Sequence, residues 1–457
     1  MSLSTLSTPA SRPALSPPRP AHRWKVLTVG VAANAAFSAA AAGLPATAVF
    51  MRSGYRLDND QLGLALGLMG LGVALFELPW GMLADRWGDR PVLLGGLGAT
   101  AAALAWMSLY AAPTHGAVPT LWLLAVGLLL VGVMGGSVNG ASGRAVMAWF
   151  DEGERGLAMS IRQTAVPLGG GLGALVLPWL ASQLGFAAVF GLLGALCAGA
   201  ALLTLGWLRE PDRMRPHPAH AVPAAPTHAA AAPMPAHTAS AAAPPMPGTP
   251  AATPPTRSAP PSPLRDARVW RAALAIGLLC CPQFAVLTFA TVFLHDYSGA
   301  GIATLTAVMV AVQVGAMAAR IASGRWTDRR GNRRAYLRGC VWLGFSLFAV
   351  LAGVAWRLQD VASDPLAVAA VAVLLAVAGI CVSAWHGVAY TELATLAGAQ
   401  RAGTALGLAN TCVYLGLFLT PLALPHLVAA SSWPLAWLVA GGLMLTALPL
   451  LPRTARP

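Results

Sequence analysis

One block of ten residues occurs twice in this chain. Residues 81–90 (GMLADRWGDR) recur as residues 324–333 (GRWTDRRGNR), so two glycines, an aspartate and two arginines repeat at a spacing of 243 residues. Each copy follows a long apolar run, and a short charged turn between apolar helices is typical of a tight hairpin at a membrane surface. The repetition at matching places predicts a membrane protein built from two similar halves.

The composition indicates the same class of protein. Hydrophobic residues make up 57% of the chain and charged residues 10%, with a mean hydropathy of +0.65. A water-soluble globule of 457 residues would have too little polar surface at this composition. Runs of about 20 apolar residues occur near 25–50, 60–84, 91–111, 120–149, 156–182, 185–208, 269–294, 301–326, 335–356, 365–391, 401–428 and 433–452. We therefore expect an all-α integral membrane protein with twelve transmembrane helices in two pseudo-symmetric six-helix bundles.

The net charge of +13 comes from arginines that cluster on one side of the predicted membrane. If the helices alternate in direction, that side holds both charged blocks, the N-terminal segment and the polar gap between the halves. Positively charged loops remain in the cytoplasm, so we expect a cytoplasmic (inner) membrane protein with both termini in the cytoplasm. No basic stripe interleaves with aromatic residues on a soluble element, so we expect no nucleic-acid partner.

The chain divides into five segments. Residues 1–24 are predicted to be a disordered cytoplasmic N-terminus and 25–209 the first bundle; a disordered Pro/Ala-rich linker covers 210–267, the second bundle 268–452, and a cytoplasmic tail 453–457. The linker lacks the aromatic and branched residues that would bury a core. The histidines of the linker are irregularly spaced and the six cysteines show no metal-ligand spacing, so we expect no metal and no cofactor.

The repeated block resembles the signature of the loop between helices 2 and 3 in the major facilitator superfamily. The second copy is the closer match, because the first has Asp89 where a basic residue is usual and Pro91 where another would follow. The resemblance implies a transporter, in which helices 1, 2, 4, 5, 7, 8, 10 and 11 surround a central cavity. It also implies that the block gates the transport path, through Asp85, Arg86, Arg90, Asp328, Arg329 and Arg333.

Polar side chains are distributed unevenly among the apolar runs. The third, sixth, ninth and twelfth runs offer only hydroxyls, which can bond to their own helix, whereas the other runs carry amides and charges. Polar groups inside a membrane normally face a protein interior or a water-filled cavity. The candidate substrate-binding residues are Asn34, Asn139, Arg162, Gln163, Thr164, Gln283, His386, Asn410 and Thr411.

Arg162 is the most informative of these residues. It lies seven residues after Arg155, about 10 Å into the run at 1.5 Å per residue, so it needs a partner. One hypothesis is a clamp for a substrate carboxylate or another anion. The alternatives are an ion pair with Glu77 that holds the bundle together and a hydrated arginine near the cytoplasmic mouth. In the second half, residues 405–411 correspond to residues 158–164, and the place of Arg162 is taken by an alanine.

Other charged residues have a structural and a functional interpretation each. Glu77 and Arg320 both lie four residues before the first glycine of a block and are predicted to be gating or structural charges. Arg144 is either a gating residue or a helix-end arginine close to the acidic residues at 151–154. His386 is either a proton carrier or a histidine bonded to a helix neighbour, and Glu392 is expected to be a solvated helix-end charge.

These patterns predict a monomeric secondary transporter that moves a small organic solute by rocking two bundles. An anion is favoured as the solute because the charges deep in the helices are mostly arginines. A proton is a candidate coupling ion, and membrane lipids are the expected surroundings. The stretch 167–173 (PLGGGLG) partly resembles a drug/proton antiporter signature, so proton-coupled efflux is the first alternative and a non-transporting solute sensor the second. No phosphate-binding loop or catalytic constellation occurs, so the chain is not expected to be an enzyme. Breaks at Gly43–Pro45 and at Cys281–Pro282 are expected in the first helix of each half.

Overall fold

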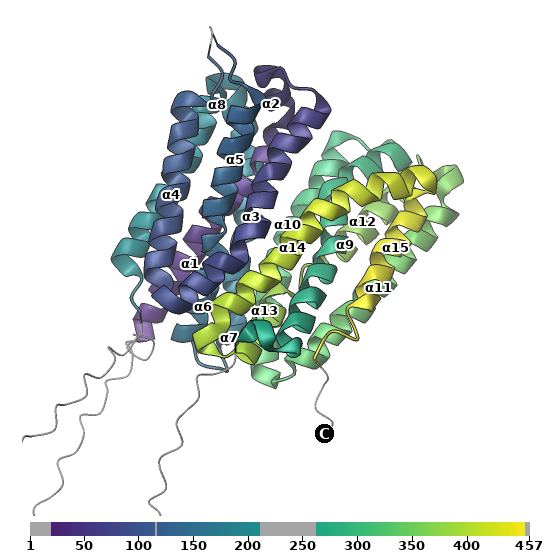
Figure 1. The fold of residues 1–457 in the computed structure, drawn as a ribbon. Helices are drawn as coiled ribbons and strands as arrows, with labels where there is room; N and C mark the ends of the chain where they lie inside the picture. Colours follow the sequence, from purple (N-terminus) through teal and green to yellow (C-terminus); the bar gives the residue numbers. More distant parts are fainter. Residues whose placement is uncertain (1–19, 115–116, 211–261, 453–457) are drawn as a thin grey trace, which may run out of the picture.

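The computed structural model describes residues 20–114, 117–210 and 262–452. Within these ranges every regular element is a helix, and Figure 1 shows two groups of long helices side by side. The predicted disordered N-terminus, linker and tail lie mostly outside the described residues. Two short parts of these predicted disordered segments are helical in the structure. The helix α1 (Pro20–Ala41) begins before residue 25, and a turn of 3-10 helix, η3 (Pro263–Arg265), lies in the last part of the predicted linker.

The first half consists of helices that are separated or interrupted by several breaks. They are α1 (Pro20–Ala41), η1 (Leu44–Thr47), α2 (Ala48–Tyr55), α3 (Asn59–Trp87), α4 (Asp89–Tyr110), α5 (Leu121–Gly135), α6 (Ser137–Trp149), α7 (Arg155–Gln163) and α8 (Ala165–Trp207). The break predicted at Gly43–Pro45 is present between α1 and α2. It brings Gly43 against Gly173 of α8, where a Cβ on Gly43 would lie 2.8 Å from the other glycine's Cα.

The second half follows a similar order. Its helices are α9 (Ala267–Ser298), α10 (Ile302–Arg330), α11 (Arg333–Arg357), α12 (Pro365–Cys381), α13 (His386–Ala397), α14 (Ala402–Ala430) and α15 (Trp433–Thr446). Pro282 lies inside α9, so the break predicted there is wrong. A membrane helix can continue through a proline when neighbouring groups satisfy the freed backbone.

The number of membrane crossings agrees with the prediction. Ten helical stretches are long and apolar enough to cross a membrane. One of them, Arg155–Trp207, has 53 residues and turns at Gly185 (φ 75°), so it contains two crossings. With the shorter apolar helix Trp433–Thr446, the described residues provide the twelve expected crossings.

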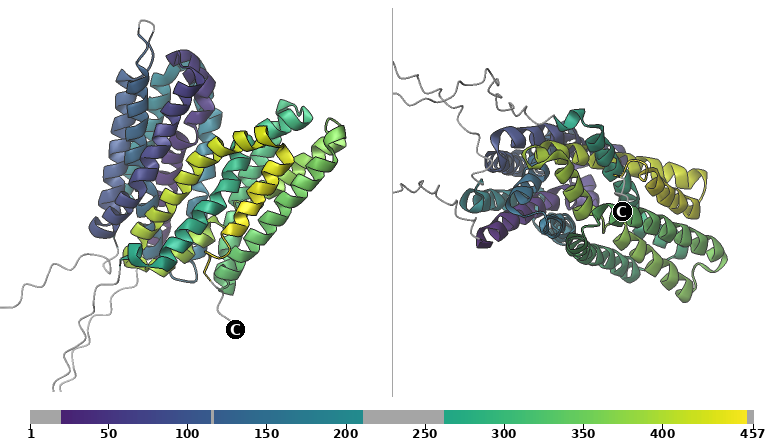
Figure 2. Two further views of the ribbon diagram at one scale, coloured as in Figure 1. Left: turned by 45° about the vertical axis from the view of Figure 1, so that its right-hand side comes forward. Right: turned by 90° about the horizontal axis from the view of Figure 1, so that it is seen from below.

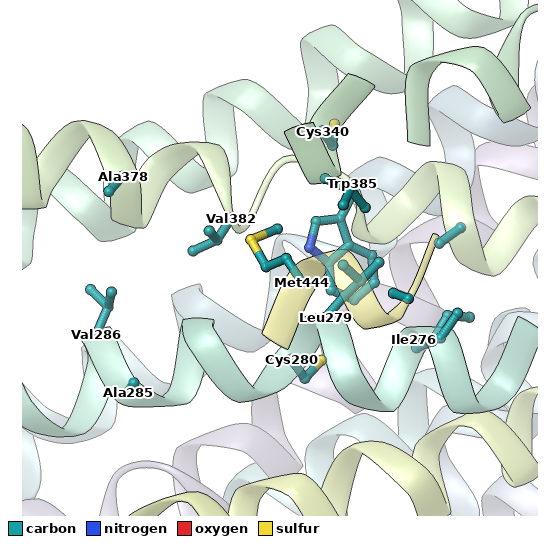
Figure 3. Packing of buried hydrophobic residues seen from close by; sticks show 14 of the residues in the cluster. Ile276, Leu279, Cys280, Ala285, Val286, Cys340, Ala378, Val382, Trp385 and Met444 are labelled. Carbon is teal, nitrogen blue, oxygen red and sulfur yellow. The ribbon is translucent and has the colours of Figure 1, made fainter. Parts of the chain in front are cut away.

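Each half has its own apolar core. In the second half Trp385 and Leu279 are fully buried and pack near Val382 and Met444 (Figure 3). The two halves approach each other at the end where residues 81–90 and 324–333 lie, which we call the hairpin end. Toward the opposite end their ribbons diverge (Figures 1 and 2).

Glycines permit the close approach of the halves at the hairpin end. A Cβ on Gly81 of α3 would lie 2.2 Å from the carbonyl oxygen of Gly403, and one on Gly324 of α10 would lie 2.4 Å from that of Gly156. No side chain larger than hydrogen fits at these positions without moving the helices apart. The hairpin end is therefore closed by backbone-to-backbone packing.

Candidate functional site

A buried carboxylate lies where the two halves meet in the membrane. Glu77 of α3 is fully buried and accepts hydrogen bonds from Asn139 Nδ2 of α6 at 2.5 Å and from Asn410 Nδ2 of α14 at 3.4 Å. Asn410 in turn accepts a hydrogen bond from the hydroxyl of Tyr390 at 2.6 Å. The chain of polar contacts therefore crosses from the first half into the second.

Arg162 of α7 joins the same network from the first half. It is 1% exposed and donates to Ser142 Oγ at 2.9 Å, to the carbonyl of Asn139 at 2.6 Å and to Asn34 Oδ1 at 3.5 Å. No described carboxylate forms an ion pair with it. The alternative of a direct ion pair with Glu77 is therefore wrong, because Asn139 stands between the two charges and contacts both.

Arg320 of α10 is a second buried arginine whose contacts, within the described chain, include no carboxylate. It is 2% exposed and donates to the carbonyl of Ser383 at 3.0 Å and, across the halves, to the carbonyl of Gln163 at 2.6 Å. Gln163 is the last residue of α7, and Ser383 lies between α12 and α13. Carbonyls at such helix breaks have no partner within their own helix and are free to accept.

His386 begins α13 and is enclosed by its neighbours. Its Nδ1 lies 3.1 Å from the carbonyl of Ser383, its Nε2 lies 3.9 Å from Cys280 Sγ, and its ring stacks on Trp385 with centroids 4.0 Å apart. No described carboxylate contacts it. These contacts match the alternative of a histidine bonded to a neighbour rather than that of a proton carrier paired with an acid.

The remaining candidate substrate-binding residues have varied surroundings. Thr411 donates to the carbonyl of Ala74 in the other half at 3.0 Å, and Asn34 donates to Ser142 Oγ at 2.9 Å, so both belong to the network. Thr164 bonds back to Ile161 of its own helix. Gln283 is 7% exposed, and its Oε1 is buried without a partner.

The two block aspartates cap helices of the opposite half. Asp85 accepts from the backbone N–H groups of Gly403 and Thr404 at 2.9 and 2.8 Å, at the start of α14. Asp328 accepts from those of Gly156 and Leu157 at 3.1 and 2.7 Å, at the start of α7. Because a helix N-terminus carries a partial positive charge, both contacts hold the halves together at the hairpin end.

The arginines around these aspartates differ between the two halves. Arg333 donates to Asp328 at 2.9 Å and also to the carbonyl of Glu152. Its counterpart Arg90 turns away and donates to the carbonyl of Leu205.

In the first half Arg144 takes the place that Arg90 leaves. Its Nε lies 3.3 Å from Asp85 and its terminal nitrogen 2.8 Å from Asp89, so the prediction that it lies close to the acidic residues at 151–154 is wrong. Asp89, the departure from the family pattern, supplies this arginine with a buried partner. Arg86 and Arg329 are exposed.

Three outcomes were not foreseen from the sequence. Glu392 is 7% exposed and paired with Arg334 at 2.6 Å, so it is not a solvated charge. Tyr390 and Ser142 are members of the network but were not among the candidates. The position of Tyr390, four residues and thus about one turn after His386, was the available signal for it.

The sequence model described as the Major Facilitator Superfamily matches residues 29–356 and 299–457. The chain therefore belongs to the Major Facilitator Superfamily, whose members are transporters and not enzymes. This finding agrees with the repeated hairpins and the twelve crossings, and it confirms the resemblance noted in the sequence.

Individual relatives cover most of the chain. An uncharacterised MFS-type transporter of Mycobacterium tuberculosis, Rv2994, is 29% identical over 93% of this chain and 86% of its own length. The probable sulfoacetate transporter SauU of Cupriavidus necator is 25% identical over 87% of this chain and 85% of its own. Among solved structures, the proton:xylose symporter XylE matches with a TM-score of 0.70 and 14% identity over 94% of this chain and 95% of its own, which supports the fold.

Proposed function

We propose that this protein is a secondary transporter of a small organic anion in the cytoplasmic membrane. The observation that carries the proposal is Arg162, a buried guanidinium in the membrane region with no described carboxylate as partner. Keeping an arginine in a membrane interior is costly unless it serves a path or pairs with a charge. A substrate carboxylate or sulfonate would bind this guanidinium directly, which no described carboxylate of the protein does.

The proposed substrate-binding residues are those of the network and its neighbours. Arg162 is the anchor, because a planar guanidinium binds a carboxylate through two parallel hydrogen bonds. Asn34, Asn139, Asn410 and Thr411 supply neutral donors and acceptors around it, and Gln283 offers an unused buried oxygen from the second half. Gln163, Thr164 and His386 complete the set. The relative SauU is a probable transporter of sulfoacetate, an organic anion, which supports this class of substrate.

Transport would proceed by rocking the two halves about this site. In the described state Asp85, Asp328 and the glycine contacts close the hairpin end, and the halves diverge at the other end. With the hairpins in the cytoplasm, this is the state closed on the cytoplasmic side. Arg320 and Arg333 donate to carbonyls of the first half, and Glu77 accepts from Asn410 of the second half, so these three residues hold the closure directly. Arg144 supports it through Asp85. Arg86, Arg90 and Arg329 form no described hydrogen bond or ion pair across the halves, and their gating role rests on the resemblance to the family signature alone.

The test is transport by the purified protein in proteoliposomes. A panel of labelled carboxylates, sulfonates, sugars, amino acids and cations is offered for uptake and counterflow, with and without a proton gradient. We expect an organic anion to be exchanged, and Arg162→Lys to lose most of that exchange while the exposed Arg357→Lys does not. Competition by cations or neutral solutes alone would reject the anion, and binding without counterflow would indicate a sensor.

A further inference from the structure

A pocket of about 520 Å³ opens at the hairpin end, outside the membrane network. Its lining residues come from both halves and from the end of the linker: Met82, Asp85, Arg86, Ser262, Gln400, Arg401 and Thr404. Two of them are arginines: Arg86 in the last turn of α3 and Arg401 directly before α14. A volume of this size accommodates a small ligand or a headgroup.

Neither arginine of the pocket is engaged by the described protein. Arg86 and Arg401 form no hydrogen bond or ion pair with any described residue. The one carboxylate in the lining, Asp85, already accepts from two backbone N–H groups of α14 and lies 3.3 Å from Arg144 Nε. The pocket therefore retains two uncompensated positive charges.

The pseudo-symmetric place between the halves has one of the two arginines replaced by an acid. Arg329 corresponds to Arg86 through the repeat of 243 residues. Arg401 corresponds to Glu154, because Gly403 and Thr404 at the start of α14 play the part of Gly156 and Leu157 at the start of α7. Glu154 is an acid and is paired with Arg23. The equivalent place between the halves thus holds Arg329 and an acid that is already paired with Arg23, whereas this pocket holds two free arginines.

We propose that this pocket binds a phosphate-type oxyanion that bridges Arg86 and Arg401. Guanidinium groups bind tetrahedral oxyanions through forked hydrogen bonds, and the side chains of Ser262 and Gln400 add neutral donors. The oxyanion is carried either by an anionic lipid headgroup or by a free phosphate. Met82, 47% exposed beside the two charges, gives a lipid chain an apolar contact.

Such an anion affects the transport cycle by connecting the two halves. Arg86 belongs to the first half and Arg401 to the second, so an oxyanion between them stabilises the state that is closed at the hairpin end. Anything that binds one state better shifts the population toward it. This role is independent of which solute the central site carries.

The experiment uses the full chain in nanodiscs of neutral phosphatidylcholine. One arm titrates inorganic phosphate, and the other replaces part of the lipid with phosphatidylglycerol, while the unfolding temperature is followed. We expect a saturable rise in at least one arm, because a ligand of the native state stabilises it. A rise only with phosphatidylglycerol assigns the site to a lipid headgroup, and a rise with phosphate assigns it to a soluble anion.

The variants distinguish binding of the anion in this pocket from a general attraction of anions to the basic surface of the protein. Arg86→Ala and Arg401→Ala should each weaken the response at least tenfold, and Arg401→Glu, which copies the acid of the other half, should abolish it. Arg329→Ala, the matched control, should respond as the wild type does. No rise in either arm, or an equal loss in Arg329→Ala, would overturn the proposal.

Discussion

Asp85 and Asp328 make the same contact in opposite directions. Each lies in the hairpin of its own half and accepts the first N–H groups of a helix in the other half, α14 for Asp85 and α7 for Asp328. The two contacts are related by the repeat of the chain. Closing the hairpin end therefore depends on one interaction used twice.

Removing the charge of Asp85 should loosen this closure. Asp85→Asn retains one acceptor oxygen but loses the attraction to the helix terminus, which contributes about 1 kcal/mol, or roughly a fivefold change in the ratio of the two states. Ser160, fully buried between Gly324 and Gly387, serves as the reporter when replaced by cysteine in a background without the native cysteines. In the Asp85→Asn variant we expect Ser160→Cys to be labelled faster by maleimide, and transport to be slower, than when Asp85 is present. Unchanged labelling with full transport would remove Asp85 from the gate.

Adding one methyl group at Gly81 should prevent closure. The Cβ of Gly81→Ala would lie 2.2 Å from the carbonyl oxygen of Gly403, so α3 must move away from α14. We expect the Gly81→Ala protein to be inserted normally but to transport at least tenfold more slowly. The Ser160→Cys reporter should stay accessible to maleimide in this variant, because the hairpin end cannot close. Gly63→Ala is the control on the same helix, because no atom lies within 4 Å of its added Cβ. Equal effects of both changes would contradict the gating explanation.

Arg162 distinguishes a substrate anchor from a structural charge. Arg162→Lys keeps the charge but loses the forked geometry, so anion binding should weaken about tenfold or more, and Arg162→Ala should abolish binding. Because Asn139 separates Arg162 from Glu77, the double change Glu77→Ala/Arg162→Ala should not restore transport. Binding and yield of the singles and the double decide the matter, and wild-type transport by the double would reject the anchor.

The linker prediction depends on the sequence alone, since residues 215–260 lie outside the described part of the chain. A low-complexity segment of this length constrains the two bundles only weakly. Shortening it substantially should leave the yield and the transport rate close to those of the full chain. A large loss of insertion or of uptake would reveal a structural role for this segment.

The sequence predicted the architecture well because membrane crossings are local features. A run of apolar residues and a repeated hairpin identify helices and halves without knowledge of their packing. The family signature singled out Asp85 and Asp328 as gating candidates, but the helices that they cap were found only in the structure. Apart from the break expected at Cys281–Pro282, the errors concern contacts between helices. Arg144 pairs with Asp89 across 55 residues of sequence, and Asn139 separates Glu77 from Arg162; no periodicity contains that information.

Arg320 reaches the first half through the main-chain oxygen of Gln163 rather than through its side chain. A substitution at position 163 changes the side-chain amide but leaves this oxygen in place. The chain can thus exchange the side chain at a candidate substrate contact without losing the bond that closes the halves beside it. In the proposed mechanism, position 163 therefore serves substrate selectivity through its side chain and gating through its main chain, and each can vary independently of the other.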